Sequence, residues 1–218
     1  MAMKDKQALV AVMTLCLAPG SYGDDDSLRV NITPSVASAV VRHGESMVTI
    51  MRRQDPSSTV NSIYAKTSRD CPPFCVQPIS VSPGVETIGE LELLEYLQQI
   101  TEGDKSILVI DSRTPEWVKQ GTIPGAINLP WTLISPAAGA DPFEIADVLE
   151  TKFGAIAQEG LWNFSNAKTL VLFCNGIWCG QSPTNIRTLL QFGYPAQRIK
   201  WYRGGMQAWE GLGLTVVR

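Results

Sequence analysis

Two cysteines separated by four residues are the part of this sequence best suited to chemistry. Cys174 follows the apolar run Thr169-Leu-Val-Leu-Phe173, and Cys179 closes the loop Cys174-Asn-Gly-Ile-Trp-Cys179. The run is typical of a buried strand, and Ser182-Pro183 with the apolar spacing after it is typical of a helix start. Unpaired N–H groups and the positive dipole end of such a helix lower a thiol's pKa. The segment therefore predicts a nucleophilic Cys174, the alternative being a buried core cysteine.

Three blocks of the sequence resemble the rhodanese-like sulfurtransferases. That family places its catalytic cysteine first in a six-residue loop between strand and helix, and residues 174–179 match that frame. Residues 107–130 resemble the family's first block, with a strand ending in Asp111-Ser-Arg113 and a later Ile-Pro-Gly-Ala turn, and residues 201–209 resemble its final block. The resemblance covers about residues 87–218. It implies an α/β fold with a mainly parallel five-stranded sheet and helices on both faces.

The resemblance also implies sulfur transfer through a persulfide on Cys174. The thiolate would take the outer sulfur of a small donor such as thiosulfate, a polysulfide or a persulfide. It would then pass that sulfur to a thiol or another acceptor, including a sulfur-carrier or redox protein. Asp111 and Arg113 are expected to pair and support the site. The loop residues expected to cradle the persulfide are Asn175, Gly176, Ile177, Trp178 and Gly180. Neither a metal nor a cofactor is implied.

The loop departs from the family pattern in two ways. It holds no Arg or Lys to bind an anionic donor such as thiosulfate, and Arg113 and Arg203 are the nearest candidates to compensate. Its last residue is a second thiol, Cys179, which could resolve the Cys174 persulfide or carry its sulfur onward. A structural disulfide or a small buried side chain are the alternatives for Cys179. The chain could accordingly be a thiol-disulfide oxidoreductase or a non-catalytic binding module, whereas a phosphatase is disfavoured because the loop lacks a phosphate-binding arginine.

A second cysteine pair, Cys71-Pro-Pro-Phe-Cys75, lies in a proline-rich segment of residues 68–84. Proline excludes a helix there, so an extended linker is expected. The pair is a possible disulfide or redox pair, and it could exchange with Cys174 and Cys179. A zinc site shared by the four cysteines is disfavoured because the spacings depart from the usual C-x2-C.

Apolar runs and helix-start signals in the sequence predict the strands and helices that position the cysteine loop. Strands are expected near residues 107, 126, 169, 199 and 214, with the reactive crevice at their carboxyl ends. Thr87-Ile-Gly-Glu90 resembles a capping box, which predicts a helix to about Ile100. Further helices are expected at about 115–119 and 142–157. The inward positions of the first helix are expected to be Ile88, Leu91, Leu94 and Leu97.

The first 86 residues divide into two expected regions. Residues 1–23, with Lys4, Lys6 and a short apolar stretch before small residues, resemble a signal peptide. A periplasmic or secreted protein is therefore expected, with no stable membrane span after cleavage and with Cys16 removed. Residues 24–86 are expected to form a β-rich extension and the cysteine linker, including a hairpin that turns at Gly44. His43 and Arg52-Arg53 are expected to be solvated there.

Composition limits the class of partner. The chain has 218 residues and a net charge of −3, which suits one ordinary domain with an extension. A nucleic-acid partner is not expected, because the chain lacks a basic stripe with interleaved aromatic residues.

Overall fold

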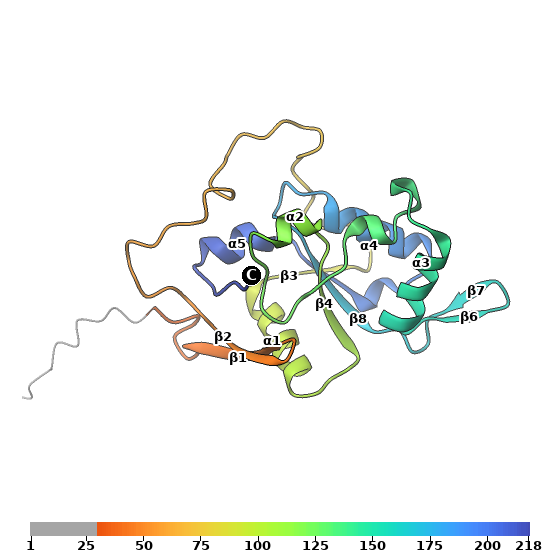
Figure 1. Ribbon diagram of the computed structural model, residues 1–218, viewed down its shortest axis with the longest axis horizontal. Helices are drawn as coiled ribbons and strands as arrows, with labels where there is room; N and C mark the ends of the chain where they lie inside the picture. The colour runs from red at the N-terminus through yellow and green to blue at the C-terminus, as the bar shows by residue number, and fades with distance from the viewer. Residues whose placement is uncertain (1–29) are drawn as a thin grey trace, which may run out of the picture.

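A five-stranded parallel sheet forms the centre of the computed structural model, which describes residues 30–218 (Figure 1). The strand order is β3-β9-β8-β4-β5, and every pairing in this sheet is parallel. The predicted α/β fold with a parallel five-stranded sheet is confirmed. The strands are β3 (Glu86–Ile88), β4 (Ile107–Asp111), β5 (Ile127–Asn128), β8 (Thr169–Phe173) and β9 (Ile199–Tyr202).

Helices cover both faces of this sheet because the side chains of its central strands alternate between two apolar cores. Val171 and Phe173 of β8 belong to the core beneath α1 (Glu90–Thr101) and α5 (Gly205–Gly211). Leu170 and Leu172 belong to the core beneath α4 (Gln181–Gln191) and α3 (Pro142–Asp147). A strand buried on both faces is apolar throughout, as this one is. The remaining elements are α2 (Pro115–Val118), a π turn (Val148–Lys152), short 3-10 turns at Trp131–Leu133, Pro136–Ala138 and Ala196–Arg198, and the hairpin β6 (Ile156–Gln158) and β7 (Leu161–Asn163).

The start of α1 differs from its prediction. Thr87 is part of β3, and its hydroxyl donates to the carbonyl of Ile79, so it does not cap the helix. Gly89 is the N-cap instead, and its N–H donates to the Glu92 carboxylate at 2.9 Å. The two-residue shift changes the inward face, which consists of Leu93, Leu94 and Leu97, while Leu91 is 48% exposed.

Two other predicted elements were also wrong. The fifth strand of the sheet is β3, which pairs with β9, whereas Leu214 makes only an isolated antiparallel bridge with Arg52. The helix expected over 142–157 ends with the π turn at Lys152, and the chain then enters β6. The helix stops there because Gly154, just past its end, has φ 76°, the left-handed conformation that commonly ends a helix.

The extension contains the predicted hairpin, formed by β1 (Ser38–His43) and β2 (Ser46–Met51), with Gly44 at φ 57° in the turn. Val41 and Ile50 are fully buried in the core that includes α1. His43 is not simply solvated, because its Nδ1 accepts the N–H of Gly125 at 3.1 Å. The hairpin is therefore an integral layer of the structure.

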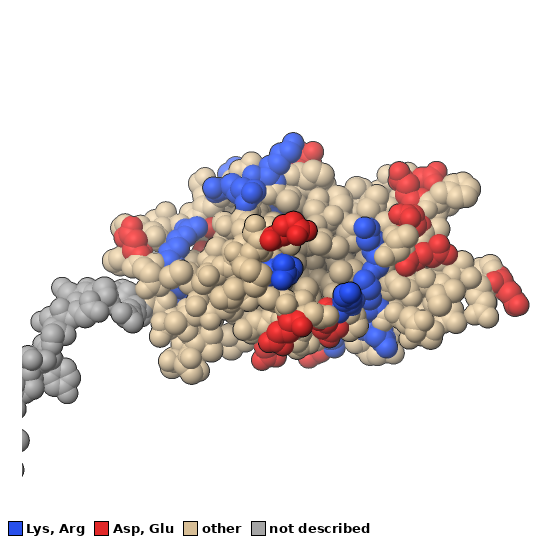
Figure 2. All heavy atoms as spheres, turned by 60° about the horizontal axis from the view of Figure 1, so that its bottom comes forward, with Lys and Arg blue, Asp and Glu red and all other residues tan. Residues whose placement is uncertain are grey.

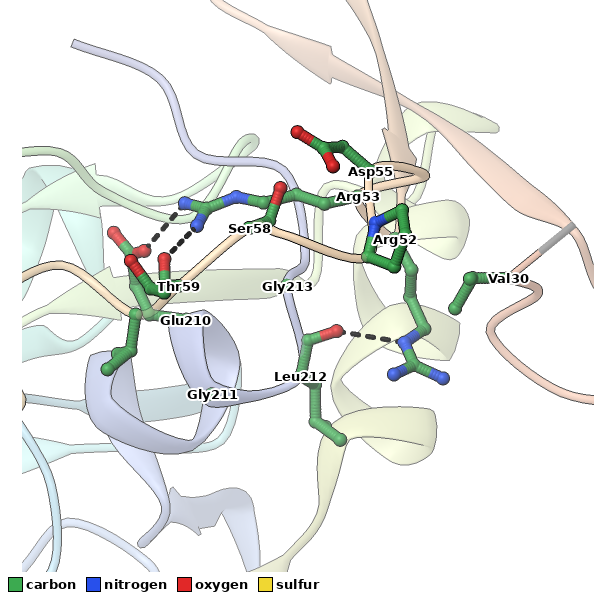
Figure 3. Close-up of a pocket in the computed structure, with 12 residues that line it drawn as sticks. Val30, Arg52, Arg53, Asp55, Ser58, Thr59, Glu210, Gly211, Leu212 and Gly213 are labelled. Atoms are coloured by element: carbon green, nitrogen blue, oxygen red, sulfur yellow. Dashed lines mark hydrogen bonds and ion pairs between the residues drawn. The ribbon is translucent and has the colours of Figure 1, made fainter. Parts of the chain in front are cut away.

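Arg52 and Arg53 attach this extension to the C-terminal turn around a small pocket (Figure 3). Arg52 Nε donates to the carbonyl of Leu212 at 2.8 Å, and Arg53 Nη2 pairs with the buried Glu210 carboxylate at 2.9 Å. Arg53 Nη1 also donates to the Thr59 carbonyl at 2.6 Å. The expectation of a purely solvated pair was therefore wrong.

Charges of both signs are interspersed over the face shown in Figure 2. None of the helices within residues 30–218 is long and apolar enough to cross a membrane. The predicted signal peptide of residues 1–23, with Cys16, lies outside the described residues.

Candidate active site

The cysteine loop joins the end of β8 to the start of α4 and rests against α5. The carbonyls of Cys174 and Asn175 accept the N–H groups of Met206 and Gln207 at 3.0 and 2.9 Å. Gly205 has φ 54°, and a Cβ there would collide with the Cys174 carbonyl and lie 2.8 Å from the Gly176 nitrogen. Only glycine fits this contact, which explains Gly205 of the last sequence block.

The Cys174 sulfur is buried among hydrogen-bond donors. The residue is 2% exposed, and the Ser182 hydroxyl donates to its sulfur at 3.1 Å. Trp201 Nε1 in turn donates to the Ser182 oxygen at 3.1 Å, which orients that hydroxyl toward the sulfur. Burial raises the pKa of Cys174, but hydrogen bonds from Cys179, from Ser182 and from the Gly176 N–H outweigh it and lower the pKa to about 7. Much of Cys174 is therefore thiolate at neutral pH.

Cys179 is a second free thiol in the same enclosure, and it too is 2% exposed. Its N–H donates to the Gly176 carbonyl at 2.9 Å, which closes the loop, and Asn175 Nδ2 lies 3.9 Å from its sulfur. The hydrogen bond to Cys174, followed by burial, raises the pKa of Cys179. Of the two thiols, Cys174 is therefore the one that ionises more readily, while Cys179 favours its protonated form.

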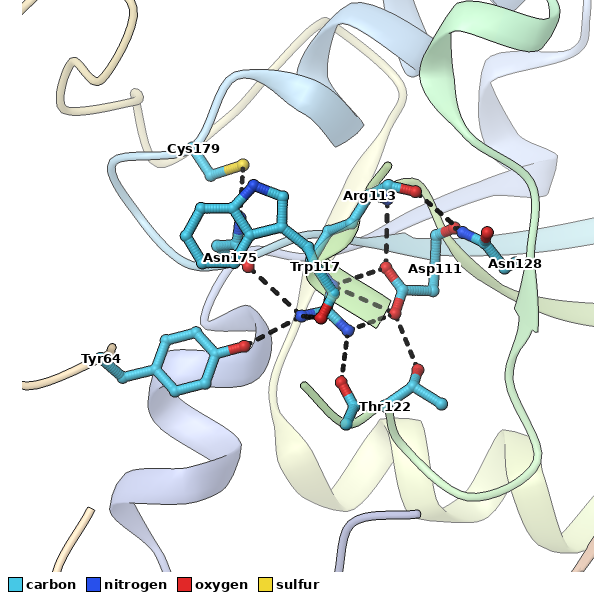
Figure 4. A network of polar contacts seen from close by, with 9 residues as sticks. Tyr64, Asp111, Arg113, Trp117, Thr122, Asn128, Asn175 and Cys179 are labelled. Carbon is cyan, nitrogen blue, oxygen red and sulfur yellow. Dashed lines mark hydrogen bonds and ion pairs between the residues drawn. The ribbon is translucent and has the colours of Figure 1, made fainter. Parts of the chain in front are cut away.

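Arg113 is the hub of a buried polar network (Figure 4). Its Nε and Nη2 donate to the Asp111 carboxylate, with Nη2 2.6 Å from Oδ2, and Nη2 also donates to the Gly121 carbonyl at 2.7 Å. Its Nη1 donates to the Tyr64 hydroxyl at 2.9 Å and to Asn175 Oδ1 at 3.3 Å. All its donors are occupied by protein, so Arg113 supports the loop and has none left for an anionic donor.

Tyr64 is a member of this network that the sequence analysis did not predict, as are Trp117, Thr122 and Asn128. It is 3% exposed, and it comes from the extension, 49 positions before Arg113. A single tyrosine in an irregular segment carries no periodic pattern, so the sequence held no signal for this contact. The extension therefore helps to hold the reactive loop in place.

The other predicted loop residues have different surroundings. The Asn175 side chain is engaged by Arg113 and Cys179, and the Ile177 side chain is 40% exposed. Trp178 is 9% exposed, and its Nε1 donates to Gln207 Oε1 at 2.8 Å. Among the residues expected to form the cradle, the Gly176 N–H is the group that stabilises the Cys174 thiolate.

Residues 68–79, which we call the cysteine strap, cross over this loop. Phe74 packs edge-on against Trp178 with ring centroids 5.4 Å apart, and the Arg69 guanidinium lies 3.8 Å from a Trp178 ring centroid. Cys71 and Cys75, on either side of Phe74, are joined through their sulfur atoms with Cα atoms 5.1 Å apart. The strap thus places an aromatic cover over the cysteine loop.

The backbone of the strap is tied to both neighbouring elements. The Gln77 N–H donates to the Ile177 carbonyl at 2.7 Å, and Arg203 Nη2 donates to the Gln77 carbonyl at 2.7 Å. Arg203 Nε also donates to the Pro78 carbonyl at 2.9 Å. Arg203, the second candidate to bind an anionic donor, therefore holds the strap.

A cavity of about 330 Å³ opens beside Cys179. Cys179 is among its lining residues, whereas Cys174 is not, and its walls include the rings of Phe74, Trp117 and Trp131. None of its lining residues is Lys, Arg, Asp, Glu or His. The described part of the chain contains no cluster of His, Cys, Asp and Glu that could hold a metal ion. The complete lining is Pro73, Phe74, Trp117, Trp131, Asn175, Cys179, Gly180, Gln181 and Thr184.

Residues 93–212 match the family model of the Rhodanese-like domain. No curated protein matches the chain. Solved structures with a similar fold include a human single-domain sulfurtransferase, with 22% identity over 57% of this chain and 95% of that chain and a TM-score of 0.38. A Saccharomyces cerevisiae single-domain sulfurtransferase has 18% identity over 57% and 88%, with a TM-score of 0.38. A thiosulfate sulfurtransferase from Pseudomonas aeruginosa has 16% identity over 64% of this chain and 21% of that chain, with a TM-score of 0.42.

Proposed function

Since the chain belongs to the rhodanese-like domain family, we propose that it is a sulfurtransferase that carries sulfane sulfur as a persulfide on Cys174. The observation that carries this proposal is the buried Cys174 sulfur between β8 and α4, which accepts the Ser182 hydroxyl at 3.1 Å and whose pKa is lowered by its hydrogen bonds. The thiolate attacks the outer sulfur of the donor, the bond between that sulfur and the rest of the donor breaks, and the rest leaves with the bonding electrons. For thiosulfate the group that leaves is sulfite, and for an organic persulfide it is a thiolate.

Cys179 acts on the Cys174 persulfide in this proposal. When it attacks the outer sulfur, the persulfide moves to Cys179 and Cys174 leaves as a thiolate. When it attacks the inner sulfur, a Cys174–Cys179 disulfide forms and sulfide leaves, so two thiols are oxidised while the sulfane sulfur is reduced. The short loop and the hydrogen bond between the two cysteines support either route.

A thiol-disulfide oxidoreductase is the second candidate, favoured by the two free thiols in one enclosure. We also propose that the protein works in an oxidising compartment after export. The signal-like residues 1–23 and the joined Cys71 and Cys75 support that location.

Mass spectrometry of the reduced protein tests the function. After brief exposure to polysulfide, we expect an adduct of about 32 Da on Cys174, which Cys174→Ser abolishes. Cys179→Ser should keep the adduct and lose the release of sulfide. The matched control is the double variant Cys71→Ser with Cys75→Ser, which should keep both the adduct and the release of sulfide. A wild-type protein that forms only a reversible Cys174–Cys179 disulfide, with no adduct, would instead be an oxidoreductase.

A further inference from the structure

We propose that the uncharged cavity beside Cys179 binds the sulfur acceptor, and that this acceptor is an uncharged organic thiol of low molecular weight. The inference rests on the proposed function and adds a substrate class to it. A volume of about 330 Å³ is enough for a small organic molecule.

The position of Cys179 assigns the cavity to the acceptor. Cys179 lines the cavity, whereas Cys174 is not among the lining residues. A thiol bound in the cavity therefore meets Cys179 first. Once the persulfide has moved to Cys179, the sulfur of the acceptor thiol attacks its outer sulfur. The sulfur–sulfur bond breaks, Cys179 leaves with the bonding electrons and takes up the proton that the acceptor thiol loses, and the acceptor becomes a persulfide, with no outside oxidant or reductant needed.

The residues that line the cavity disfavour the binding of a charged acceptor. Phe74, Trp117 and Trp131 supply aromatic surface, and no lining residue is a cation that could pair with a carboxylate or sulfonate. Arg113 directs all its donors at protein atoms, and Arg203 donates to two carbonyls of the cysteine strap. A charged acceptor would lose its hydration without gaining an ion pair, which is costly.

Two of the lining residues, Trp131 and Gln181, nevertheless carry buried polar atoms that lack partners. Trp131 Nε1 and Gln181 Oε1 are buried and make no hydrogen bond within residues 30–218. Buried polar groups are normally paired, so a donor and an acceptor on two lining residues suit an acceptor molecule with a neutral group that both accepts and donates. An amide is such a group, and pairing with it requires the Trp131 and Gln181 side chains to turn their buried atoms toward the cavity.

The test uses two thiols that differ by one negative charge and one methyl group, N-acetylcysteine and its methyl ester. Protein loaded with polysulfide is mixed with each thiol, and loss of the persulfide is followed by mass spectrometry. Each rate is divided by that thiol's rate with a free small-molecule persulfide, which removes differences in intrinsic reactivity. We expect the ester to discharge the protein at least about tenfold faster than the acid, since burying one unpaired charge costs well over 1.4 kcal/mol.

Variants of the cavity sharpen the result. Gln181→Lys should reverse the preference toward the acid, because it supplies the missing cation. Gln181→Leu and Trp131→Phe should each raise the ester concentration at half-maximal rate about threefold to tenfold, since each removes one hydrogen-bonding atom. Gln99→Leu, on the exposed side of α1, is the matched control and should behave as wild type.

Equal corrected rates for the two thiols in both wild type and Gln181→Lys would overturn the assignment. A protein that never acquires the Cys174 adduct would instead refute the proposed function, so the two failures are distinguishable.

Discussion

The two cysteine pairs contrast sharply, although the segments that carry them are in contact through Phe74 and Trp178. Cys174 and Cys179 are each 2% exposed, remain free thiols and follow a central strand of the sheet. Cys71 is exposed, Cys75 is half-buried, and the two are joined in an irregular segment. Similar spacing in sequence thus gives different chemistry, because hydrogen bonds and burial decide whether a sulfur becomes a nucleophile.

The two pairs also differ in how they are held. The loop pair depends on buried charge and on backbone contacts with α5. The strap pair depends on a few surface hydrogen bonds and on the packing of Phe74 against Trp178. We therefore expect the protein to tolerate changes around the strap better than changes around the loop.

Removal of the arginine that supports each pair should give the largest difference. Arg113→Met leaves the fully buried Asp111 carboxylate unpaired, so we expect a loss of about 3–5 kcal/mol in the free energy of unfolding. Arg203→Met removes hydrogen bonds to carbonyls at the protein surface, and we expect a loss of about 1 kcal/mol. Urea denaturation of the two variants measures both values. Equal losses would contradict the claim that only the loop pair depends on buried charge.

The next largest effect should be seen in how the alkylation rate of Cys174 depends on pH, since this depends on the hydrogen bonds that are particular to the loop pair. Alkylation of Cys174 requires the thiolate, so its rate should rise with pH through a midpoint near 7 and level off above it. Ser182→Ala removes a hydrogen bond that lowers this pKa, which moves the midpoint upward. A hydrogen bond to a charged group contributes about 1.5–3 kcal/mol, so the rate at pH 7 should fall by about sevenfold to eightyfold and should recover toward pH 9.

The control for this profile is the double variant Ser182→Ala with Trp201→Phe, which also removes the indole N–H that Ser182 satisfies. It should show the same shifted midpoint as the single variant. An unchanged midpoint in both variants, measured by mass spectrometry of the alkylated peptide, would show that Ser182 does not set the reactivity of Cys174.

The sequence predicted the parts of the site that depend on neighbours along the chain. The apolar run before Cys174, the helix start after it and the pairing of Asp111 with Arg113 all involve residues close in sequence. The contacts of Tyr64 with Arg113 and of Phe74 with Trp178 join distant segments without a repeating pattern. The same limit explains the wrong prediction of a fifth strand near Leu214. The fifth strand is β3, and its pairing with β9 depends on the whole sheet and not on residues close in sequence.

The smallest effect should come from opening the strap pair. Cys71→Ser with Cys75→Ser removes a ring of only a few residues, for which chain entropy gives at most about 2 kcal/mol of stabilisation. Loading of Cys174 with sulfur should change by no more than about threefold, because the loop's own hydrogen bonds remain while local opening of the strap becomes easier. Phe74→Ala keeps the cysteines and removes the contact with Trp178, so it should have a similar effect if the pair serves to hold Phe74 in place. Loss of loading in the cysteine variant but not in Phe74→Ala would mean that Cys71 and Cys75 exchange sulfur or electrons with the loop, and the division between a structural and a reactive pair would fail.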